Sequence, residues 1–514
     1  MGKAIEKIIS HAVCLAFALL FLLTALPEAI AFEQGLWPEP LKKTLPGFDI
    51  KPVKIKTKSR DLTLTIAVPL YRSGGEVQDF GSAFTVKRIQ AQDGYVVIPA
   101  SRIPVFVEEG PASAGISEGK VSPFGVLGGA KFDPHMVDLG LGTVRVAGDL
   151  RLSWGQIEPE QGRFDMEHVA GIDKAVSEYT RNGLAFMVSV YTQNPWDMLG
   201  AQKAREFWAE WKRNPGQKER AFAAKLPRDM NAYSRFLKWA VERYDGDGFH
   251  DASGSPRIDY WQITNEPDIE WKDTPKNLAR LQKASYIAIK EADPTAKVVL
   301  SGVGMPRGFL NVYVPMIEEL ARIKEAPGAR YFDIFDFHWW VGGEGGYLVA
   351  NDRFFMSGIG SFKEYVELIR QTLDRHGYAG IPLWITETST HVGKPAEKKL
   401  NLPFQSELQQ AVELVKRFVY PLSLGVEKVF WNRIIDPHNY AGNPDSFFNT
   451  VGLIHNHRNK GLSSKKLSYF TYKKLIEKLG GSDWKRIERL DSGEDIFAYR
   501  FTGQGRSVYV VWTR

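Results

Sequence analysis

From about residue 122 onwards, short apolar runs alternate with longer amphipathic stretches. Eight runs have the length and apolar content of buried strands, and helical stretches follow most of them. Asn231–Tyr244, Leu278–Glu291 and Phe362–His376 each carry apolar side chains at helical spacing. This alternation predicts parallel βα units. The eight predicted strands are Phe124–Leu127, Thr143–Val146, Ala185–Val190, Tyr260–Thr264, Val298–Ser301, Ile334–Phe337, Leu383–Thr386 and Val429–Trp431.

Eight βα units over about 350 residues fit an α/β fold of the (β/α)₈ TIM-barrel type with long loops. A doubly wound open sheet is the alternative, but it usually has fewer strands and a glycine-rich first turn. Gly128 and Gly129 follow the first predicted strand without forming the Gly-x-Gly-x-x-Gly pattern. The sequence therefore favours the barrel and gives no support for a dinucleotide site.

The flanks of this region have a different pattern. Residues 50–110 contain several short runs with strand-like alternation, broken by glycine and proline, and two similar runs lie close to the C-terminus. We expect residues 32–118 and 481–514 to form one composite, sandwich-like β-domain beside a barrel that spans residues 119–480. Two separate small β-elements are the alternative. The clearest runs are Leu62–Val68, Phe84–Ile89, Tyr95–Ile98, Ile496–Phe501 and Ser507–Trp512.

The N-terminus has the pattern of an export signal. Lys3 and Lys7 precede a fifteen-residue apolar run, Ala12–Leu26, and Ala29-Ile30-Ala31 forms an A-x-A cleavage pattern. The run is shorter than the roughly 20 residues of a membrane span. We therefore expect cleavage after Ala31, export to the periplasm or beyond the cell, and no stable membrane insertion afterwards. An uncleaved anchor is the alternative.

Composition excludes several classes of function. The 514 residues include 66 basic and 60 acidic ones, and a net charge of +6 is too dilute over this length to indicate nucleic-acid binding. The single cysteine, Cys14, lies inside the apolar run, so a disulfide scaffold and a cysteine-based zinc site are both excluded. The mature chain must therefore depend on a large apolar core.

Two glutamates follow predicted strands directly. The run Tyr260–Thr264 leads into Asn265-Glu266-Pro267, and Leu383–Thr386 leads into Glu387. In (β/α)₈ barrels the reacting groups lie at the carboxyl ends of strands, and strands four and seven end across the mouth from each other. Two carboxylates across a cleft, one protonated and one ionised, are what glycoside hydrolysis requires. From these residues alone, the stereochemical outcome remains open.

At this point the chain resembles the (β/α)₈ retaining glycoside hydrolases whose acid/base glutamate follows strand four and whose nucleophile follows strand seven. Within that clan it most resembles family 39 and the related endoglycosidases associated with bacterial exopolysaccharides. The resemblance covers about residues 122–480. Besides the two glutamates it rests on Thr143–Val146 with Ser153–Pro159 and Gly162–Asp165, on Tyr244–Gly248 and on Ala292–Lys297.

The resemblance implies a role for several residues. Glu266 is then the general acid/base and Glu387 the nucleophile, with retention of configuration and without a cofactor or metal ion. Asn265 is expected to bind the sugar 2-hydroxyl, and Arg145 to keep the nucleophile ionised. His338 and Trp431 are expected to line the subsite at which cleavage occurs.

At strand six the sequence departs from the family. Relatives often have His-x-Tyr, with the tyrosine hydroxyl near the nucleophile, but here the run is His338-Trp339-Trp340. Tyr191 or Tyr313 could supply that hydroxyl, or else Trp339 or Trp340 could serve as a platform for a neighbouring sugar ring. Trp154, after strand two, is a further candidate sugar contact, unless it packs against a barrel helix.

The sequence thus predicts a carbohydrate substrate and three candidate activities. A hydrolase acting on a polysaccharide or oligosaccharide is favoured. A transglycosidase uses the same two glutamates, and a binding protein that has lost catalysis would keep only the barrel. The sugar, the linkage, endo or exo action and the oligomeric state are left open.

Overall fold

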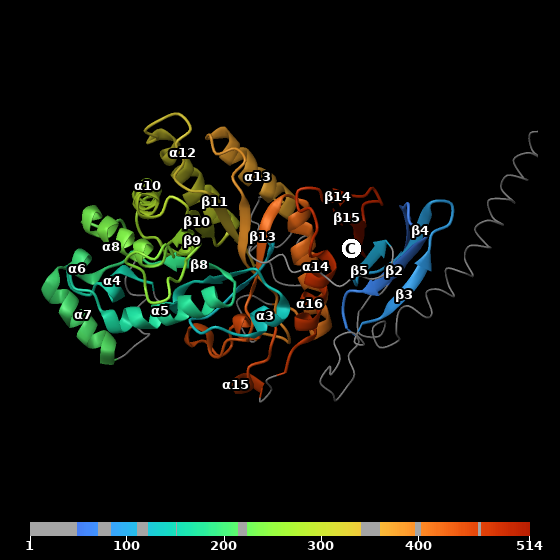
Figure 1. The fold of residues 1–514 in the computed structure, drawn as a ribbon, viewed down its shortest axis with the longest axis horizontal. Coiled ribbons are helices and arrows are strands. Elements are labelled where there is room, and N and C mark those ends of the chain that lie inside the picture. The colour runs from blue at the N-terminus through green and yellow to red at the C-terminus, as the bar shows by residue number, and fades with distance from the viewer. Residues whose placement is uncertain are drawn as a thin grey trace, which may run out of the picture. The chain divides into compact units, whose positions relative to one another are not determined.

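The computed structural model describes residues 49–69, 84–109, 122–150, 152–213, 224–340, 360–395, 402–460 and 464–514. These residues form two compact units (Figure 1). One contains the described residues up to Glu109 together with Glu488–Arg514, and the other runs from Ser122 to Ile487. The predicted export signal lies outside the described residues.

The larger unit contains a closed barrel of eight parallel strands, which confirms the predicted fold class. Every predicted barrel strand is present, and the ring closes where β13 pairs with β6. In ring order the strands are β6 (Phe124–Leu127), β7 (Thr143–Val146), β8 (Ala185–Val190), β9 (Tyr260–Ile263), β10 (Lys297–Val303), β11 (Ile334–Trp339), β12 (Leu383–Thr388) and β13 (Val426–Asn432).

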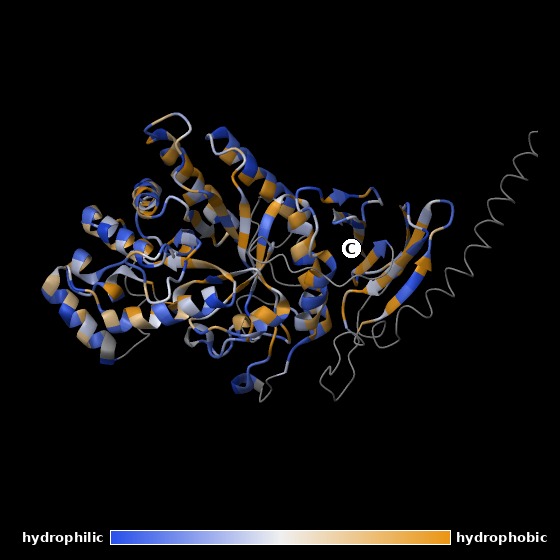
Figure 2. Ribbon diagram, in the orientation of Figure 1, coloured by the Kyte–Doolittle hydropathy of each residue, from blue (hydrophilic) through white to orange (hydrophobic). Residues whose placement is uncertain are grey.

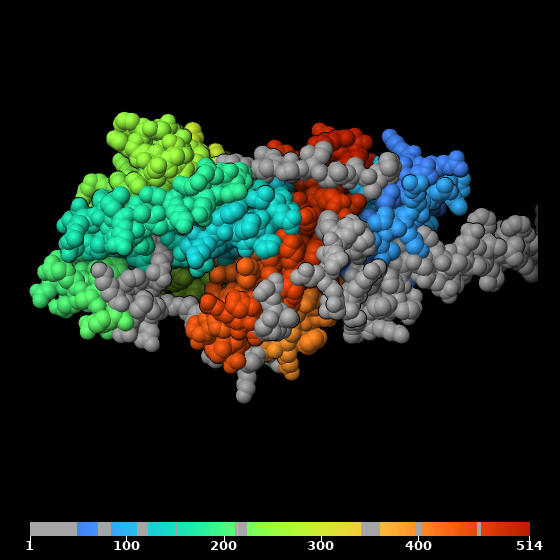
Figure 3. Space-filling view, turned by 60° about the horizontal axis from the view of Figure 1, so that its bottom comes forward, coloured from blue at the N-terminus to red at the C-terminus, as the bar shows by residue number. Residues whose placement is uncertain are grey.

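Helices connect successive strands and surround the barrel, and Figure 2 shows their alternating hydrophilic and hydrophobic colouring. In Figure 3 the teal-to-green surface is formed by the helices and loops from α5 to α8. No described helix is long and apolar enough to cross a membrane. The longer helices are α5 (Met166–Arg181), α7 (Ala201–Arg213), α8 (Met230–Arg243), α10 (Pro275–Ala292), α12 (Val314–Arg322), α13 (Phe362–Arg375), α14 (Glu407–Ser423) and α16 (Leu467–Leu479).

Shorter helical segments lie mostly at the ends of strands. The segment α9 (Pro267–Glu270) begins shortly after β9, and the residue before it, Glu266, is its N-terminal cap. The others are α3 (His135–Leu139), η2 (Gly148–Leu150), α4 (Trp154–Ile157), α6 (Pro195–Leu199), α11 (Pro306–Gly308), η4 (Phe309–Tyr313), η5 (Tyr440–Gly442), η6 (Phe447–Thr450) and α15 (His457–Lys460).

Successive residues of a strand face alternately into the barrel and outward to the helices. On β11 the outward residues Phe337 and Trp339 pack against Phe362 and Tyr365 of α13. The intervening residues face inward, beginning with Ile334 in the apolar core. This period of two makes β11 present Asp336 and His338 to the barrel interior.

An apolar layer fills the interior and supports the site. It consists of Met187, Val299, Ile334, Trp384 and Phe430, each from a different strand. Gly125 of β6 leaves room for it, because a Cβ there would lie 2.5 Å from the ring of Phe430. Two residues further along each of these strands, toward its carboxyl end, the inward side chain is polar.

The smaller unit joins strands from both ends of the chain, as the sequence predicted. Its six-stranded sheet has the order β14-β15-β16-β5-β2-β3, and β1 and β4 form a separate pair. The last strand, β16, is not an edge, because it lies between β15 and β5 with antiparallel pairing on both sides. The strands are β1 (Lys51–Lys56), β2 (Asp61–Ile66), β3 (Val86–Gln90), β4 (Tyr95–Ala100), β5 (Val105–Glu109), β14 (Glu488–Arg489), β15 (Ile496–Gly503) and β16 (Arg506–Thr513).

Candidate active site

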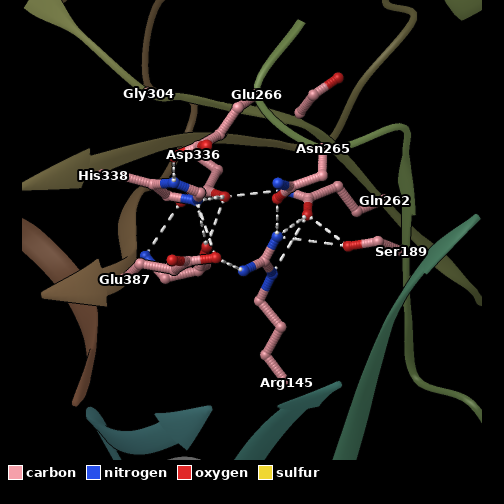
Figure 4. A network of polar contacts seen from close by, with 12 residues as sticks. Arg145, Ser189, Gln262, Asn265, Glu266, Gly304, Asp336, His338 and Glu387 are labelled. Atoms are coloured by element: carbon pink, nitrogen blue, oxygen red, sulfur yellow. Dashed lines mark hydrogen bonds and ion pairs between the residues drawn. The ribbon is translucent and has the colours of Figure 1, made fainter. Parts of the chain in front are cut away.

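The barrel brings Glu266 and Glu387 together at the carboxyl ends of β9 and β12 (Figure 4). One carboxylate oxygen of each glutamate and one ring nitrogen of His338 all lie within 4.8 Å of one another. Both glutamate side chains are partly accessible, at 19% for Glu266 and 12% for Glu387, whereas His338 is fully buried. Both carboxylates are therefore partly accessible beside a buried imidazole.

Glu387 is held by groups from two other strands. Nη1 of Arg145 lies 2.5 Å from its Oε1, and Nδ2 of Asn432 donates to its Oε2 at 3.3 Å. Burial by itself would raise the pKa of this carboxyl group. The positive charges of His338 and Arg145 outweigh burial and lower the pKa of Glu387 below its ordinary value. Glu387 is thus the carboxylate that stays ionised.

The guanidinium of Arg145 is completely buried and is hydrogen-bonded on several sides. Besides Glu387, it donates to Oε1 of Gln262 at 2.7 Å and to Oδ1 of Asn265, also at 2.7 Å. Ser189 joins this network by donating to Oε1 of Gln262. A planar donor with this many acceptors has one orientation. Arg145 therefore orients both the predicted nucleophile and the predicted sugar-binding amide.

Glu266 has an unusual backbone conformation. Its φ and ψ are 40° and 60°, and Thr264, two residues earlier, has a φ of 63°. Such angles are strained for a β-branched residue and are more frequent at functional sites. The side chain of Glu266 passes close to Gly304, where a Cβ would lie 3.0 Å from Cδ of the glutamate. Oε1 of Glu266 lies 2.6 Å from Nδ1 of His338.

His338 lies between three carboxylates. Its Nδ1 contacts Glu266, and its Nε2 lies 3.6 Å from Oδ2 of Asp336 and 3.9 Å from Oε1 of Glu387. Burial would lower the pKa of the imidazole, but Glu387, Asp336 and Glu266 outweigh it and raise the pKa of His338 to about 10. This charge environment favours the imidazolium form of the ring.

The absence of a side chain at Gly302 on β10 makes room for this imidazolium. A Cβ at this position would collide with Nε2 of His338 and would lie 2.8 Å from Oδ2 of Asp336. We expect Gly302→Ala to displace the His338 ring and to lower the free energy of unfolding by about 1–3 kcal/mol through overpacking. Thermal or urea denaturation and a crystal structure of the variant would measure both effects.

Gly171 provides the control. It lies within α5, and a Cβ there meets nothing within 4 Å. Gly171→Ala should therefore stabilise the protein by about 0.5–1 kcal/mol and leave the site unchanged. A Gly302→Ala variant as stable as the wild type, with His338 in place, would contradict the packing argument.

The three predicted tryptophans are buried. Trp431 faces away from Glu387 and donates from Nε1 to the carbonyl oxygen of Val451, while its neighbour Asn432 faces the glutamate. Trp154 packs edge-on against Trp196 and Tyr233, which is the helix-packing alternative considered for it. Trp340, at the end of β11, is 8% accessible and packs against Phe447 and Phe448.

Strand six lacks the tyrosine expected near Glu387, and strand eight supplies a polar contact to that glutamate instead. Asn432 of β13 donates to Glu387, whereas the hydroxyl of Tyr313 donates to the carbonyls of Ser301 and Gly302. Tyr191 is close enough to Arg145 and Glu387 for their charges to affect its hydroxyl, and burial raises the pKa of this tyrosine. Tyr313 is thus engaged elsewhere, and Tyr191 remains near the cluster.

The buried polar side chains of the cluster that sequence reasoning missed include Ser189, Gln262, Asp336 and Asn432. Each is a buried polar residue within an otherwise apolar strand. The signal that could have found them is their position, because each lies two positions along its strand from an inward-facing apolar or aromatic side chain. A polar side chain at such a position faces the barrel interior rather than solvent.

Among the described residues, two clusters place carboxylate oxygens or ring nitrogens close enough together for a metal ion. The first is Glu266, His338 and Glu387, but Arg145 and the protonated His338 already supply the positive charge at that place. The second is Asp245, Asp247 and Asp251, on the loop that precedes β9, at the opposite end of the barrel. There, carboxylates accept hydrogen bonds from the loop's own backbone.

No protein-family model and no curated protein matches this sequence. Among solved structures, it is similar to a family 39 glycoside hydrolase from Bacteroides cellulosilyticus WH2, with a TM-score of 0.54 and 15% identity over 90% of this chain and 87% of that one. A glucosidase from Croceicoccus marinus has a TM-score of 0.46 and 15% identity (76% and 77% covered). A family 1 β-glucosidase from Thermotoga maritima has a TM-score of 0.46 and 13% identity (72% and 100% covered). The chain therefore shares the barrel fold of a family 39 glycoside hydrolase, in line with its sequence resemblance.

Proposed function

We propose that the chain is an exported retaining glycoside hydrolase that cleaves a polysaccharide or oligosaccharide. The observation that carries this proposal is the pair of carboxylates at the barrel mouth, with oxygens within 4.8 Å of each other and one carboxylate held ionised. Retaining enzymes keep their two carboxyl groups about 5–5.5 Å apart, and inverting enzymes about 6.5–9.5 Å. The observed spacing favours retention.

In the first step the ionised Glu387 attacks the anomeric carbon as the glycosidic bond breaks. Glu266 gives its proton to the departing oxygen, and a glycosyl ester forms on Glu387. In the second step Glu266 takes a proton from water, which attacks the same carbon and releases Glu387. Arg145 and His338 supply positive charge beside Glu387 throughout, so the carboxylate is a stable leaving group in this second step.

Asn265 is the best candidate for a direct sugar contact. Its Oδ1 accepts a hydrogen bond from Arg145, which orients the amide. The Nδ2 group has no partner among the described residues and is available to a sugar hydroxyl beside Glu266. A hydrogen bond to the 2-hydroxyl that strengthens in the transition state is worth several kcal/mol in such enzymes.

The polymer is proposed from two features of the sequence. Because the sequence resembles endoglycosidases associated with bacterial exopolysaccharides and has the pattern of an export signal, we propose an exopolysaccharide as substrate and endo action as the mode. The same two glutamates could also pass the sugar to another sugar, so product analysis must separate hydrolysis from transglycosylation.

The test is release of reducing ends from a panel of plant and bacterial polysaccharides by the protein expressed from its full sequence. Oligosaccharide release by the wild type, but not by Glu387→Gln, would support the hydrolase. Products longer than the substrate fragments would indicate transglycosylation. Binding of a polysaccharide that neither protein cleaves would replace the hydrolase with a carbohydrate-binding barrel.

Arg145 should set the acid limb of the pH profile. Removing its charge in Arg145→Met raises the pKa of Glu387, so the nucleophile becomes protonated at higher pH. We expect the acid limb of kcat/KM to move up by at least about one pH unit. The loss of a buried partner should also cost about 3–5 kcal/mol of stability.

Arg433 is the comparison for this prediction. It also lowers the pKa of Glu387, but it is partly exposed and paired with Asp149. Arg433→Met should shift the acid limb in the same direction by a smaller amount. An acid limb that does not move in Arg145→Met would show that Glu387 is not the group that titrates there.

A further inference from the structure

Asp336 on β11 has no role in the mechanism above, yet it lies at the centre of the polar layer. Its side chain is completely buried. Oδ1 accepts from the backbone N–H of Thr386 at 3.0 Å, and Oδ2 accepts from the Thr386 hydroxyl at 2.6 Å and from Nε2 of Gln262 at 2.7 Å. Burying a carboxylate costs free energy unless a neighbouring positive group compensates its negative charge.

The neighbour that compensates this charge is His338, two residues along the same strand. Its Nε2 lies 3.6 Å from Oδ2 of Asp336 and 3.2 Å from the hydroxyl oxygen of Thr386. The Thr386 proton is directed to Asp336 at 2.6 Å, so toward His338 this oxygen can only accept. Nε2 must therefore carry a proton, and the anion of Asp336 stabilises it.

The other ring nitrogen determines what Glu266 can do. If Nδ1 also carries a proton, it donates to Oε1 of Glu266, and the proton of the acid must sit on Oε2. If Nδ1 is bare, it accepts the acid proton from Oε1, and that proton is turned away from the substrate. The protonation of His338 thus selects the oxygen from which Glu266 works.

The charges around this ring are balanced. Arg145 and the imidazolium of His338 are positive, and Asp336 and Glu387 are negative, so Glu266 can take up and release a proton in an otherwise neutral cluster. The titratable groups facing the cluster come from β7 (Arg145), the end of β8 (Tyr191), the residue before α9 (Glu266), α9 (Asp268), β11 (Asp336), η4 (Tyr313), β12 (Glu387) and the end of β13 (Arg433).

We propose that Asp336 is a positioning residue, whose buried carboxylate keeps His338 doubly protonated so that Nδ1 donates to Oε1 of Glu266 and leaves the acid proton on Oε2. Asp336 touches neither sugar nor the reacting atoms and acts only through His338. The inference rests on the proposed function of Glu266 as the general acid.

The first test reads His338 directly and needs no substrate. Ring ¹⁵N and ¹H signals of the ten histidines are followed from pH 6 to 10, and those of His338 are identified by their loss in His338→Gln. We expect His338 of the wild type to keep both ring protons at pH 7. In Asp336→Asn, it should lose one of them at a pH at least about two units lower than in the wild type. A neutral His338 in the wild type at pH 7 overturns the proposal, even if no Asp336 variant folds.

The second test uses the pH profile of kcat/KM on the glycoside that the wild type cleaves. Because a neutral His338 draws the acid proton to Oε1, Asp336→Asn should lose activity on the alkaline side at lower pH than the wild type. Ser189→Ala is the control, since it removes a hydrogen bond from the same polar layer without removing a charge. A purely structural role for Asp336 would lower activity at every pH and leave the alkaline limb in place, as expected for Ser189→Ala.

The two tests separate the possible failures. If no glycoside is cleaved but His338 titrates at lower pH in Asp336→Asn, the proposed function fails and the role of Asp336 in protonating His338 stands. If glycosides are cleaved and neither the His338 signals nor the alkaline limb responds to Asp336→Asn, the positioning role is wrong while the hydrolase stands.

Discussion

Glu387→Gln should abolish turnover, with a loss on the order of 10⁴-fold or more in kcat, because an amide cannot attack the anomeric carbon and leave again as a carboxylate. The amide oxygen can still accept the hydrogen bond from Arg145, so the barrel should remain folded. Reducing-end release at several substrate concentrations measures the loss, and thermal denaturation checks that the variant is folded.

Replacing Glu387 by the smaller alanine allows the role of this residue to be tested by the stereochemistry of the product. In Glu387→Ala, added azide can occupy the vacated space and attack the anomeric carbon once, which gives a glycosyl azide of inverted configuration. Substantial residual turnover in both variants, without azide, would show that the nucleophile is another residue. A retained glycosyl azide from Glu387→Ala would reverse the assignment of the two glutamates.

Glu266→Gln should affect substrates according to their leaving groups. With a natural sugar as leaving group, loss of the proton donor should lower kcat/KM by about 10²–10⁴-fold. With 2,4-dinitrophenolate, which leaves without a proton, the first step should stay close to the wild-type rate. Nδ1 of His338 can donate to the amide oxygen of the new side chain, so the local structure should persist.

The second step identifies this residue as the base. Without Glu266 the water that releases the glycosyl enzyme is not deprotonated, so a burst of dinitrophenolate should precede a slow steady state. Azide needs no base and should restore turnover in Glu266→Ala, giving a glycosyl azide of retained configuration. Equal losses for good and poor leaving groups would rule out proton donation by Glu266.

Much of the fold follows from local pattern. The eight barrel strands are apolar runs long enough to be recognised one by one, and the helices between them have a clear apolar face. The composite sheet was harder to predict. Pairing of β16 with β5 joins residues some 400 positions apart, and the bulge-free antiparallel register is a property of both strands together. Pattern along one strand says that it will pair, but not with which partner.

The site divides in the same way. Glu266 and Glu387 could be found because each ends a strand, and strand order in a barrel places such residues around one mouth. The tryptophans were a weaker inference, since aromatic side chains serve packing and sugar contact equally well in a sequence. On β13, the alternation of the strand turns Trp431 to the helices and Asn432 to Glu387, and a shift by one residue would exchange them.

The sequence by itself determined the barrel, the strand ends that carry the two glutamates, and the chemistry that two opposed carboxylates can perform. These follow from periodicity and from residue type, which are local properties. Only the tertiary structure decided that the pKa of Glu387 is lowered and that of His338 is raised. Both depend on charges from β7, β11 and β12 within a few ångströms of each other, and the pKa of a buried group is set by that three-dimensional neighbourhood rather than by its neighbours along the chain.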